Sequence, residues 1–412
     1  MESYIALAVP IFFALIAFEL FLVRHRRREY YRLADSMSNI ATGMLQQLVT
    51  LLGAVWIVGV YAWIHDRFGL FELPADAVWV WVAAFVLVDF AYYWYHRSAH
   101  EVNFLWASHI AHHQSEEYNL SVALRQGAFQ PLFSCVFYWP LAWLGVPPAV
   151  FVACLAFDTL YQFWIHTRTI DRLGPLEAVL MTPSHHRVHH GRNPRYVDRN
   201  HGGCFIFWDK LFGTFEPEGE PVVYGITSPL GSWNPLWANL HYWVELFAVA
   251  RRTRRWRDKL AMFWKPPGWH PADLGGFRPA PEIEQPPRKF DPPLARSAAL
   301  YTGLQFAQVL VASSAVSALA SGWSGVELGL ATALIAWALL GVGAVCDGRA
   351  WAPAAEALRV AATPLLCLPL LEGAGLLVAA ALVANVAPLY WLLLRGAAPG
   401  RASFDPGAGS AP

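Results

Sequence analysis

Ten of the fifteen histidines in the sequence lie in short clusters, each directly after an apolar run. Along the chain these clusters have the spacings HxxxH, HxxHH, a single histidine and a second HxxHH. Residues three and four apart share one face of a helix, so each cluster can direct several imidazoles toward one point. The pattern predicts a metal site built from His96, His100, His109, His112, His113, His166, His185, His186, His189 and His190. The histidines that stand alone are expected at the surface or in satisfied core positions: His25, His65, His201, His241 and His270.

The number of histidines narrows the choice of metal. Imidazole binds zinc, copper, iron and nickel, so the ligand type alone leaves the metal open. A structural zinc site uses about four ligands and a catalytic one about three, whereas nine or ten histidines suffice for two metals with open positions. Zinc peptidases need a glutamate inside an HExxH box, but Glu101 follows His100 instead of lying between two histidines. The Glu and ExxH pairs of carboxylate-bridged di-iron bundles are also missing, which leaves iron ligated by histidines.

The composition is that of a membrane protein. Of the 412 residues 56% are hydrophobic and only 15% are charged, and there are 20 tryptophans, far from the average soluble domain. The runs predicted to cross the roughly 30 Å hydrocarbon core lie near 4–23, 44–64, 78–95, 128–144, 149–165, 298–320, 326–346 and 374–394. A further apolar run at 360–371 is shorter than these and fits half of a broken or re-entrant element.

The arginines after the first apolar run predict which side of the membrane holds the histidines. The cluster at 24–28 follows the run, so the run is not a cleavable signal peptide, and the positive-inside rule places the cluster in the cytoplasm. Counting crossings from there, the third span returns to the cytoplasm at His96. The next two spans form a hairpin that returns at His166. All histidine clusters are therefore expected on the cytoplasmic face.

Two acidic residues lie inside apolar spans, where charged groups are costly and usually functional. Asp89 precedes His96 by seven residues and Asp158 precedes His166 by eight, so each lies on the face of its histidine. Ligating imidazoles commonly donate their second N–H to a carboxylate, and we predict this role for both; a buried polar contact between helices is the alternative. The candidate catalytic acids are Asp89, Asp158 and Glu101, and Glu116 is a further candidate for the pocket.

The fold class predicted from these runs is all-α: a polytopic membrane bundle with a cytoplasmic, histidine-rich cap that holds two metals. A basic run at 251–257 is expected at an anionic lipid surface, and a formal net charge of zero without a recognition motif argues against nucleic acid as a partner. The five cysteines form no regular framework, so no disulfide scaffold is expected. The predicted domains are N-terminal membrane helices at 1–75, a catalytic domain at 76–230, a cap and proline-rich linker at 231–296, C-terminal membrane helices at 297–396 and a disordered tail at 397–412.

The sequence in and around the histidine clusters resembles that of the membrane fatty acid hydroxylase and sterol desaturase superfamily. The likeness is strong over about 90–230, and the narrower stretches EEYNLSVALRQ and EPVVYGIT (220–227) resemble its ether-lipid branch, the alkylglycerol monooxygenases. The segments that carry the resemblance are HRSAHE (96–101), HIAHHQSEEYNLSVALRQ (109–126), YQFWIHT (161–167), TPSHHRVHHGRN (182–193) and WDKLFGTFEPE (208–218).

The resemblance implies a site and a reaction. Its metal ligands would be the ten clustered histidines, of which His185 lies just before the family box that begins at His186; Gln162 stands where some hydroxylases have another histidine. The site would hold two iron ions and use O2 to hydroxylate a lipid at the carbon next to an alkyl ether oxygen, giving a hemiacetal that separates into a glycerol derivative and a fatty aldehyde. The implied reductant is tetrahydrobiopterin, with a cytochrome b5-type carrier as the alternative. No fused haem domain or dinucleotide loop is visible, so the electron donor or pterin-recycling reductase is expected to be a separate protein.

Other functions remain open from the sequence. Within the superfamily the substrate is instead a sterol, a carotenoid or a fatty acyl chain, with hydroxylation or desaturation as the outcome. A metal transporter or a non-catalytic metal-binding membrane protein is the alternative from another class, but transport would need polar residues threaded through the spans, whereas the histidine clusters gather at one face. The membrane is a bacterial inner membrane or, with the same topology, the endoplasmic reticulum.

Overall fold

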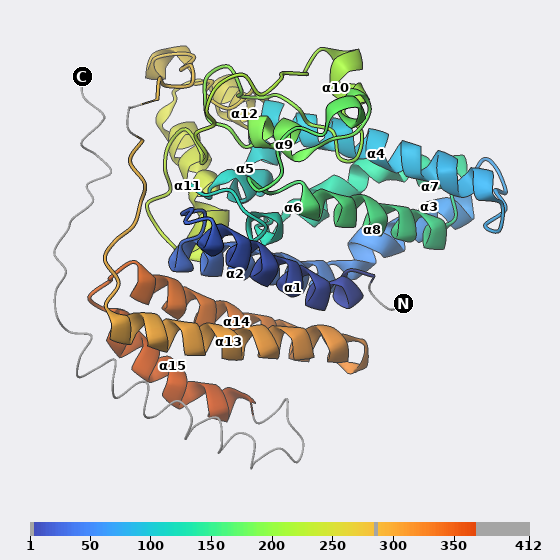
Figure 1. Cartoon of the computed structure of the whole chain (residues 1–412). Helices are drawn as coiled ribbons and strands as arrows, with labels where there is room; N and C mark the ends of the chain where they lie inside the picture. The colour runs from blue at the N-terminus through green and yellow to red at the C-terminus, as the bar shows by residue number, and fades with distance from the viewer. Residues whose placement is uncertain (1–3, 284–286, 368–412) are drawn as a thin grey trace. The chain divides into compact units, whose positions relative to one another are not determined.

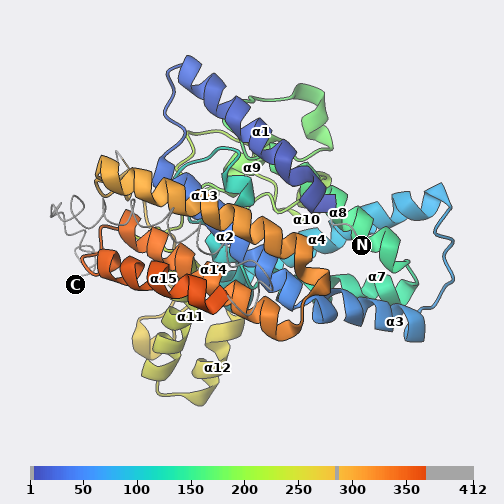
Figure 2. The same ribbon diagram turned by 90° about the horizontal axis from the view of Figure 1, so that it is seen from below.

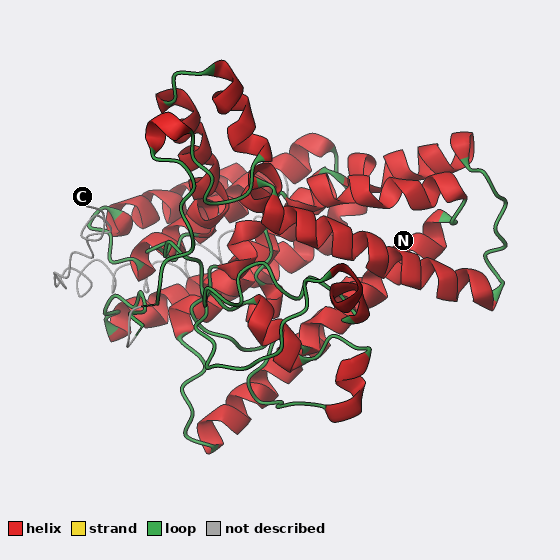
Figure 3. Cartoon of the chain, turned by 90° about the horizontal axis from the view of Figure 1, so that it is seen from above, coloured by secondary structure: helices red, strands yellow, loops and turns green. Residues whose placement is uncertain are grey.

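The computed structural model describes residues 4–283 and 287–367, and over these residues the chain is built from helices and loops without a strand (Figure 3). Two isolated antiparallel bridges, Leu180 with Phe205 and Gly191 with Tyr224, are the sheet-like pairings described. The predicted all-α class is confirmed. The predicted span at 374–394 and the tail at 397–412 lie outside the described residues.

The chain divides into two compact units. The first comprises Met1–Gln46, Gly53–Ser228 and Asn239–Arg288, and the second comprises Gln47–Leu52, Pro229–Ala238 and Lys289–Pro412. The domain boundaries proposed from the sequence stay a prediction. The helices (Figure 1) are α1 (Tyr4–His25), α2 (Leu33–Leu52), α3 (Val60–Phe68), α4 (Val78–Glu101), α5 (Asn103–His113), α6 (Gln130–Ser134), α7 (Trp139–Leu144), α8 (Pro148–Trp164), α9 (Pro183–His189), α10 (Phe207–Phe212), α11 (Pro235–Arg252), α12 (Trp256–Trp264), α13 (Arg296–Leu319), α14 (Gly325–Cys346) and α15 (Ala352–Cys367).

Four of the described helices are long and apolar enough to cross a membrane, namely α1, α4, α13 and α14, and α8 is a shorter apolar helix. They agree with the runs predicted near 4–23, 78–95, 298–320 and 326–346, and the chain is an integral membrane protein. The run predicted at 44–64 instead begins at Leu33 and bends by 59° between α2 and Val55–Phe68. A π-helical turn at Val55–Gly59 follows the break, and such turns are a common cause of kinks.

The run predicted as one span at 128–144 is not a single helix. It consists of α6, a 3-10 turn at Cys135–Tyr138 and α7. Pro131 and Pro140 each stand in the first turn of a helical piece. Proline has no N–H to continue the preceding helix, so the run folds as three short pieces.

The core of the first unit forms where α4 packs against α8 (Figure 1). Ala84 and Val88 on α4 are buried together with Phe151 and Cys154 on α8. Tyr61 of α3 stacks on Phe151 with ring centroids 4.0 Å apart. Burial on α4 continues to His100, so the helix runs past the predicted end of its span and carries the first histidine cluster into the interior.

The second unit is formed mainly by α13, α14 and α15, which pack on one another (Figure 2). Buried polar side chains bind one another across this unit. The Arg359 guanidinium and the Tyr301 hydroxyl both donate to the buried carboxylate of Glu356, at 2.7 and 2.6 Å. After the histidine region come α11, which belongs to the first unit from Asn239 onward, and α12. The predicted basic run lies at the end of α11, in the link to α12 and at the start of α12, with exposed arginine side chains. The predicted contact of this run with an anionic lipid surface stays a prediction.

Candidate metal centre

The first two histidine clusters face each other because α4 and α5 are joined by a single residue. Val102 is extended, with φ −125° and ψ 116°, so the chain turns between Glu101 and Asn103 and the two helices pack together. The turn brings His96 Nε2 to 3.1 Å from His109 Nε2. One helical turn further along α5, His113 Nε2 lies 3.1 Å from the same atom.

The remaining histidines come from the end of α8 and from α9. His166 lies two residues after the end of α8, and its Nε2 lies 3.0 Å from Nε2 of His186 on α9. Helix α9 starts at Pro183 after the extended residue Thr182, as expected for proline in the first turn of a helix. His190 follows the helix, and His112 of α5 approaches His166 with 3.5 Å between the Nε2 atoms.

Together the side chains form two groups, in each of which the potential ligand atoms all lie within 4.8 Å of one another. Every member of both groups is buried. The groups are adjacent, since the rings of His113 and His190 stack across them with centroids 4.5 Å apart. The five-histidine group is His96, His100, His109, His113 and His189, and the four-histidine group is His112, His166, His186 and His190.

Hydrogen bonds on the outer side of the rings set their orientation. Nδ1 of His112 lies 2.6 Å from the carbonyl of Arg125, and Nδ1 of His166 lies 2.7 Å from the carbonyl of Gln162. The Nδ1 atoms of His96, His109 and His189 likewise lie 2.8–2.9 Å from the carbonyl of His201, the Gln130 side chain and the carbonyl of Arg199. A carbonyl can only accept, so Nδ1 carries the proton in these rings and the lone pair is on Nε2.

The inward-facing Nε2 atoms are the ones that fit a metal. The buried Nε2 atoms of His100, His189 and His190 have no hydrogen-bond partner among the described residues. Lone pairs that face each other repel unless a cation lies between them. Two nitrogens bound at right angles to one ion at about 2.1 Å lie about 3 Å apart, close to the 3.0 and 3.1 Å separations within the groups. The donor set and its spacing therefore fit metal ions in both groups.

Burial keeps these rings neutral. Loss of solvent lowers the pKa of His109 to about 4, and that of His166 to about 4. Burial, followed by the proximity of other histidines, lowers the pKa of His112, His113 and His190 well below the usual value. Neutral imidazole is the form that binds a metal, so the centre is ready to accept ions at neutral pH.

One of the predicted histidines and all of the predicted acids lie outside both groups. The ring of His185 packs edge-on against Phe215 with centroids 5.5 Å apart, in keeping with its place just before the family box. Glu101 accepts a hydrogen bond of 2.9 Å from Arg97, one turn earlier on the surface of α4. The further candidate Glu116 contacts Arg32 at 3.4 Å. A catalytic role of Glu101 stays a prediction.

The two acids inside the helices bind a loop rather than the histidine rings. The carboxylate of Asp89 accepts from the backbone N–H of Cys204 and from Trp208 Nε1, at 2.5 and 2.7 Å. Asp158 accepts from Gln162 Nε2 at 2.8 Å and from the Cys204 thiol. The Nδ1 atoms of His96 and His166 lie against backbone carbonyls instead, so the predicted hydrogen bonds from these two rings to the acids do not form. The acids hold the 200–208 loop against α4 and α8, and a catalytic role for them stays a prediction.

Three residues around the centre were missed by the sequence analysis. His201, expected to stand alone at the surface or in a satisfied core position, is fully buried with its ring 5.0 Å from that of His100, and its carbonyl accepts from His96. Arg125, whose carbonyl accepts from His112, is also buried. Its guanidinium donates to Ala111 O and Gln114 Oε1, both at 2.6 Å.

The third residue that the sequence analysis missed is Glu19 of α1. Its buried carboxylate accepts from the backbone N–H of Leu120 at 2.8 Å and from the hydroxyls of Tyr31 and Thr167. These bonds connect α1 to the residues that flank two histidine clusters. An acid in an apolar run was a visible signal for Glu19, by the rule that identified Asp89. The isolated residues His201 and Arg125 carried no such signal.

Comparison with known proteins places these residues in a family context. A family model described as fatty acid hydroxylase matches residues 81–214, the stretch that contains both histidine groups. The chain is 41% identical to the alkylglycerol monooxygenase of Homo sapiens over 360 residues, which are 87% of this chain and 81% of that protein. It is 40% identical to that of Danio rerio over 367 residues, 88% of this chain and 82% of that protein. An ornithine lipid hydroxylase of Rhizobium tropici is 32% identical over 149 residues, covering 35% of this chain and 45% of that protein. No solved structure matches the chain.

Proposed function

This chain belongs to the fatty acid hydroxylase family, and we propose from this premise that it is a di-iron monooxygenase that hydroxylates alkylglycerols next to their ether oxygen. That it is a membrane-bound oxygenase acting on lipids follows from its relatives over most of its length. Iron as the metal, two ions per chain and ether cleavage are our proposal.

The observation that carries the proposal is the pair of adjacent histidine groups with inward-facing, unprotonated nitrogens. Five histidines in one group and four in the other supply enough ligands for two ions. An all-imidazole donor set suits iron. When bound, iron in such a site supplies the activation of O2 that attack on an unreactive C–H bond requires. The proposed ligands are the nine grouped histidines, and His185 is not among them.

The protein's own residues hold the ligands, exclude water and admit a lipid. Both groups are buried, so bulk water is kept from the place of oxidation. Helix α4, which carries His96 and His100, is among the helices apolar enough to span a membrane, and α8 ends two residues before His166. A lipid whose chain lies along such apolar helices can bring a carbon near its headgroup to the histidines. This arrangement supports a membrane lipid as the substrate.

The alkylglycerol assignment rests on the relatives that match about nine tenths of this chain. The reaction inserts one oxygen atom of O2 into the C–H bond next to the ether oxygen and reduces the other to water with two electrons and two protons. The resulting hemiacetal separates into a glycerol derivative and a fatty aldehyde. We propose tetrahydrobiopterin as the reductant, supplied by a separate recycling reductase, with a cytochrome b5-type carrier as the alternative.

A product assay tests this function directly. Anaerobically purified, iron-loaded protein in detergent receives an alkylglycerol, O2 and tetrahydrobiopterin, and mass spectrometry follows the fatty aldehyde. We expect aldehyde, about two irons per chain, and loss of aldehyde in His190→Ala, while His65→Ala serves as the control at an isolated histidine away from both groups. Turnover of a sterol or fatty acyl lipid without aldehyde would overturn the ether assignment. Zinc alone without oxygen consumption would favour metal binding or transport.

We also propose that the histidine groups face the cytoplasm. The support is the run of arginines that follows α1, which the positive-inside rule assigns to that side. A protease site inserted after residue 28 should be cut from the cytoplasmic side in intact cells or sealed microsomes. Cutting only from the opposite side would reverse the orientation.

A further inference from the structure

A line of contacting aromatic rings leads away from the four-histidine group. The ring of Tyr118 lies 5.2 Å from that of His190 and stacks at 5.8 Å on His166. Tyr224 stacks on Tyr118 almost in parallel, with centroids 4.8 Å apart and 7° between the planes. Two rings therefore connect the buried group with residue 224.

Backbone contacts fix this line in place. Gly191 pairs with Tyr224 in an antiparallel bridge, so Tyr224 is tied to the residue that follows His190. The hydroxyl of Tyr118 donates to the carbonyl of Ile165 at 3.0 Å, next to His166. Both tyrosines are thus held by the neighbours of proposed ligands. Tyr118 is fully buried and Tyr224 is 8% exposed.

Tyr224 also lines a cavity of about 350 Å³. Its other lining residues are the charged Arg168, Asp171, Arg187 and Glu218 together with Thr169, Ile170 and Val222. Arg187 in this wall is held by two hydrogen bonds of 2.9 and 2.7 Å from its guanidinium to the carboxylate of Glu218. The guanidinium carbon of Arg168 lies over the ring of Tyr30, 3.9 Å from its centroid, and over that of Tyr224, 5.5 Å from its centroid. The carboxylate of Asp171 is almost fully exposed. The wall thus combines an aromatic ring with a bonded guanidinium–carboxylate pair, a second guanidinium and an exposed carboxylate.

These walls define the ligand that would fit. Ligand cavities begin at about 300 Å³, so this one suits a small molecule and excludes a macrocycle such as haem. An aromatic wall favours a flat ring. The guanidinium of Arg168 together with the carboxylates of Asp171 and Glu218 favours a ring whose edge carries both acceptors and N–H donors. A reduced nitrogen heterocycle of two fused rings has this chemistry.

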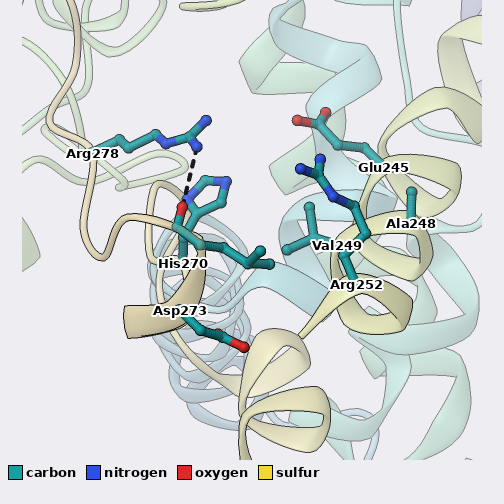
Figure 4. A pocket seen from close by; sticks show the side chains of 8 residues that line it. Glu245, Ala248, Val249, Arg252, His270, Asp273 and Arg278 are labelled. Carbon is teal, nitrogen blue, oxygen red and sulfur yellow. Dashed lines mark hydrogen bonds between the residues drawn. The ribbon is translucent and has the colours of Figure 1, made fainter. Parts of the chain in front are cut away.

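The other described cavity lacks the connection to the metal centre. It has a volume of about 390 Å³ and is lined by Glu245, Arg252, His270 and Asp273, among others (Figure 4). The only ring in its wall is that of His270, and among the described contacts this ring stacks on no histidine of either group. The feature that distinguishes the cavity at Tyr224 is the ring contact from its wall to the four-histidine group.

We propose that the cavity at Tyr224 binds the reductant, a reduced bicyclic nitrogen heterocycle, and that Tyr224 and Tyr118 carry its electrons to the four-histidine group. The inference rests on the proposed function and adds the site of the reductant. The heterocycle loses two electrons and two protons and becomes the dihydro form. The two electrons and two protons, with one oxygen atom of O2, form water, while the other oxygen atom enters the C–H bond of the lipid. Contacting rings matter because electron transfer slows steeply with distance.

Equilibrium binding tests the cavity. The probe is tetrahydrobiopterin, titrated anaerobically by calorimetry into full-length, iron-loaded protein. Tyr224→Leu should weaken binding about tenfold, as expected for one lost stacking contact, whereas Tyr224→Phe keeps the ring and should stay within about threefold. Tyr242→Leu makes the same substitution on α11, away from the cavity, and serves as the control. Unchanged binding in Tyr224→Leu would overturn the site.

Reduction kinetics test the line of rings. Tyr118 does not line the cavity, so Tyr118→Leu should bind tetrahydrobiopterin normally but reduce the oxidised centre at least about tenfold more slowly in stopped-flow spectra. Equal iron content and full reduction by dithionite would show that the centre is intact in this variant. A wild-type rate of reduction by tetrahydrobiopterin in Tyr118→Leu would refute the electron path. Reduction of the wild type by a cytochrome b5 and not by the pterin would refute the choice of occupant.

The two proposals can fail separately. If the wild type binds the pterin in a Tyr224-dependent way but forms no aldehyde from alkylglycerols, the substrate assignment fails and the reductant site stands. If aldehyde forms while Tyr224→Leu binds the pterin like the wild type, the reductant site fails and the function stands.

Discussion

Removing the metal should make the stability of the protein sensitive to acid in a way that a single histidine substitution can measure. The pKa of His109 and of His166 is lowered by burial from 6.5 to about 4. The unfolded chain therefore binds protons at these rings first as the pH falls. By linkage, the stability contributed by the neutral rings is present above pH 6.5 and is lost progressively between pH 6.5 and 4.

The size of the effect follows from these pKa values. At pH 5 a ring with a folded pKa of about 4 and an unfolded pKa of 6.5 lowers the free energy of unfolding by about 2 kcal/mol, compared with almost nothing at pH 7.5. The fully buried carboxyl of Asp209 acts in the opposite direction. Burial raises its pKa to about 6, so it binds a proton in the folded state and adds about 1.4 kcal/mol at pH 5. The buried histidines outnumber it, so acid is expected to destabilise the metal-free protein.

A comparison of variants isolates one ring from the others. The free energy of unfolding of metal-free protein in detergent is measured by denaturant titration at pH 7.5 and 5.0. The change between the two pH values should be about 2 kcal/mol smaller in His166→Gln than in the wild type. Iron-loaded protein should resist acid until the metal is released, since a bound ion excludes the proton. The reasoning is refuted if His166→Gln and the wild type respond equally to acid.

Three further outcomes are expected. Gly203→Ala places a Cβ 2.8 Å from a carboxylate oxygen of Asp89 and 2.9 Å from one of Asp158. It should lower the free energy of unfolding by about 1–3 kcal/mol in thermal or denaturant titrations. The Cβ of Gly303→Ala meets nothing within 4 Å, so this control should not destabilise the protein. Arg125→Met removes the buried guanidinium from the Ala111 carbonyl and the Gln114 side-chain oxygen and should cost about 3–5 kcal/mol in the same measurement, because each buried acceptor left without its donor costs about 1–3 kcal/mol. Elemental analysis should find two irons per chain in His185→Ala and about one in His190→Ala; an equal loss in both would contradict the ligand set.

Local periodicity explains why the histidine clusters are recognisable in the sequence. The spacing of His96 and His100 needs only that α4 continue as a helix beyond its apolar run, and it does. The same holds for His109 and His113 on α5, which share a helical face. The apolar runs for α1, α4, α13 and α14 were predictable because length and hydropathy are local properties.

Features set by distant contacts could not be predicted. The partners of Asp89 come from Cys204 and Trp208, more than a hundred residues along the chain. His201 reaches the centre on the same loop, so nothing in its own neighbourhood distinguished it from the other isolated histidines. The breaks at 53–59 and 131–140 interrupt runs that hydropathy treats as continuous, because the sum over a window ignores a π-helical turn or a proline.

The division of the histidines between the two groups also follows from helix geometry, once the clusters are known to meet. The side chains of neighbouring residues on a helix point about 100° apart, so His112 and His113 cannot both direct their rings at the same metal position. His113 joins His109, four residues before it, in the five-histidine group, and His112 lies in the other.

The second HxxHH cluster shows the inverse arrangement. His190 joins His186 in the four-histidine group, and the intervening His189 crosses to the five-histidine group. Each HxxHH cluster therefore gives two rings to one group and the third to the other, which interlocks α5 with α9. Replacing one ring weakens one group, but displacing either helix would disturb both groups at once, so the two sites form only when both helices are in place.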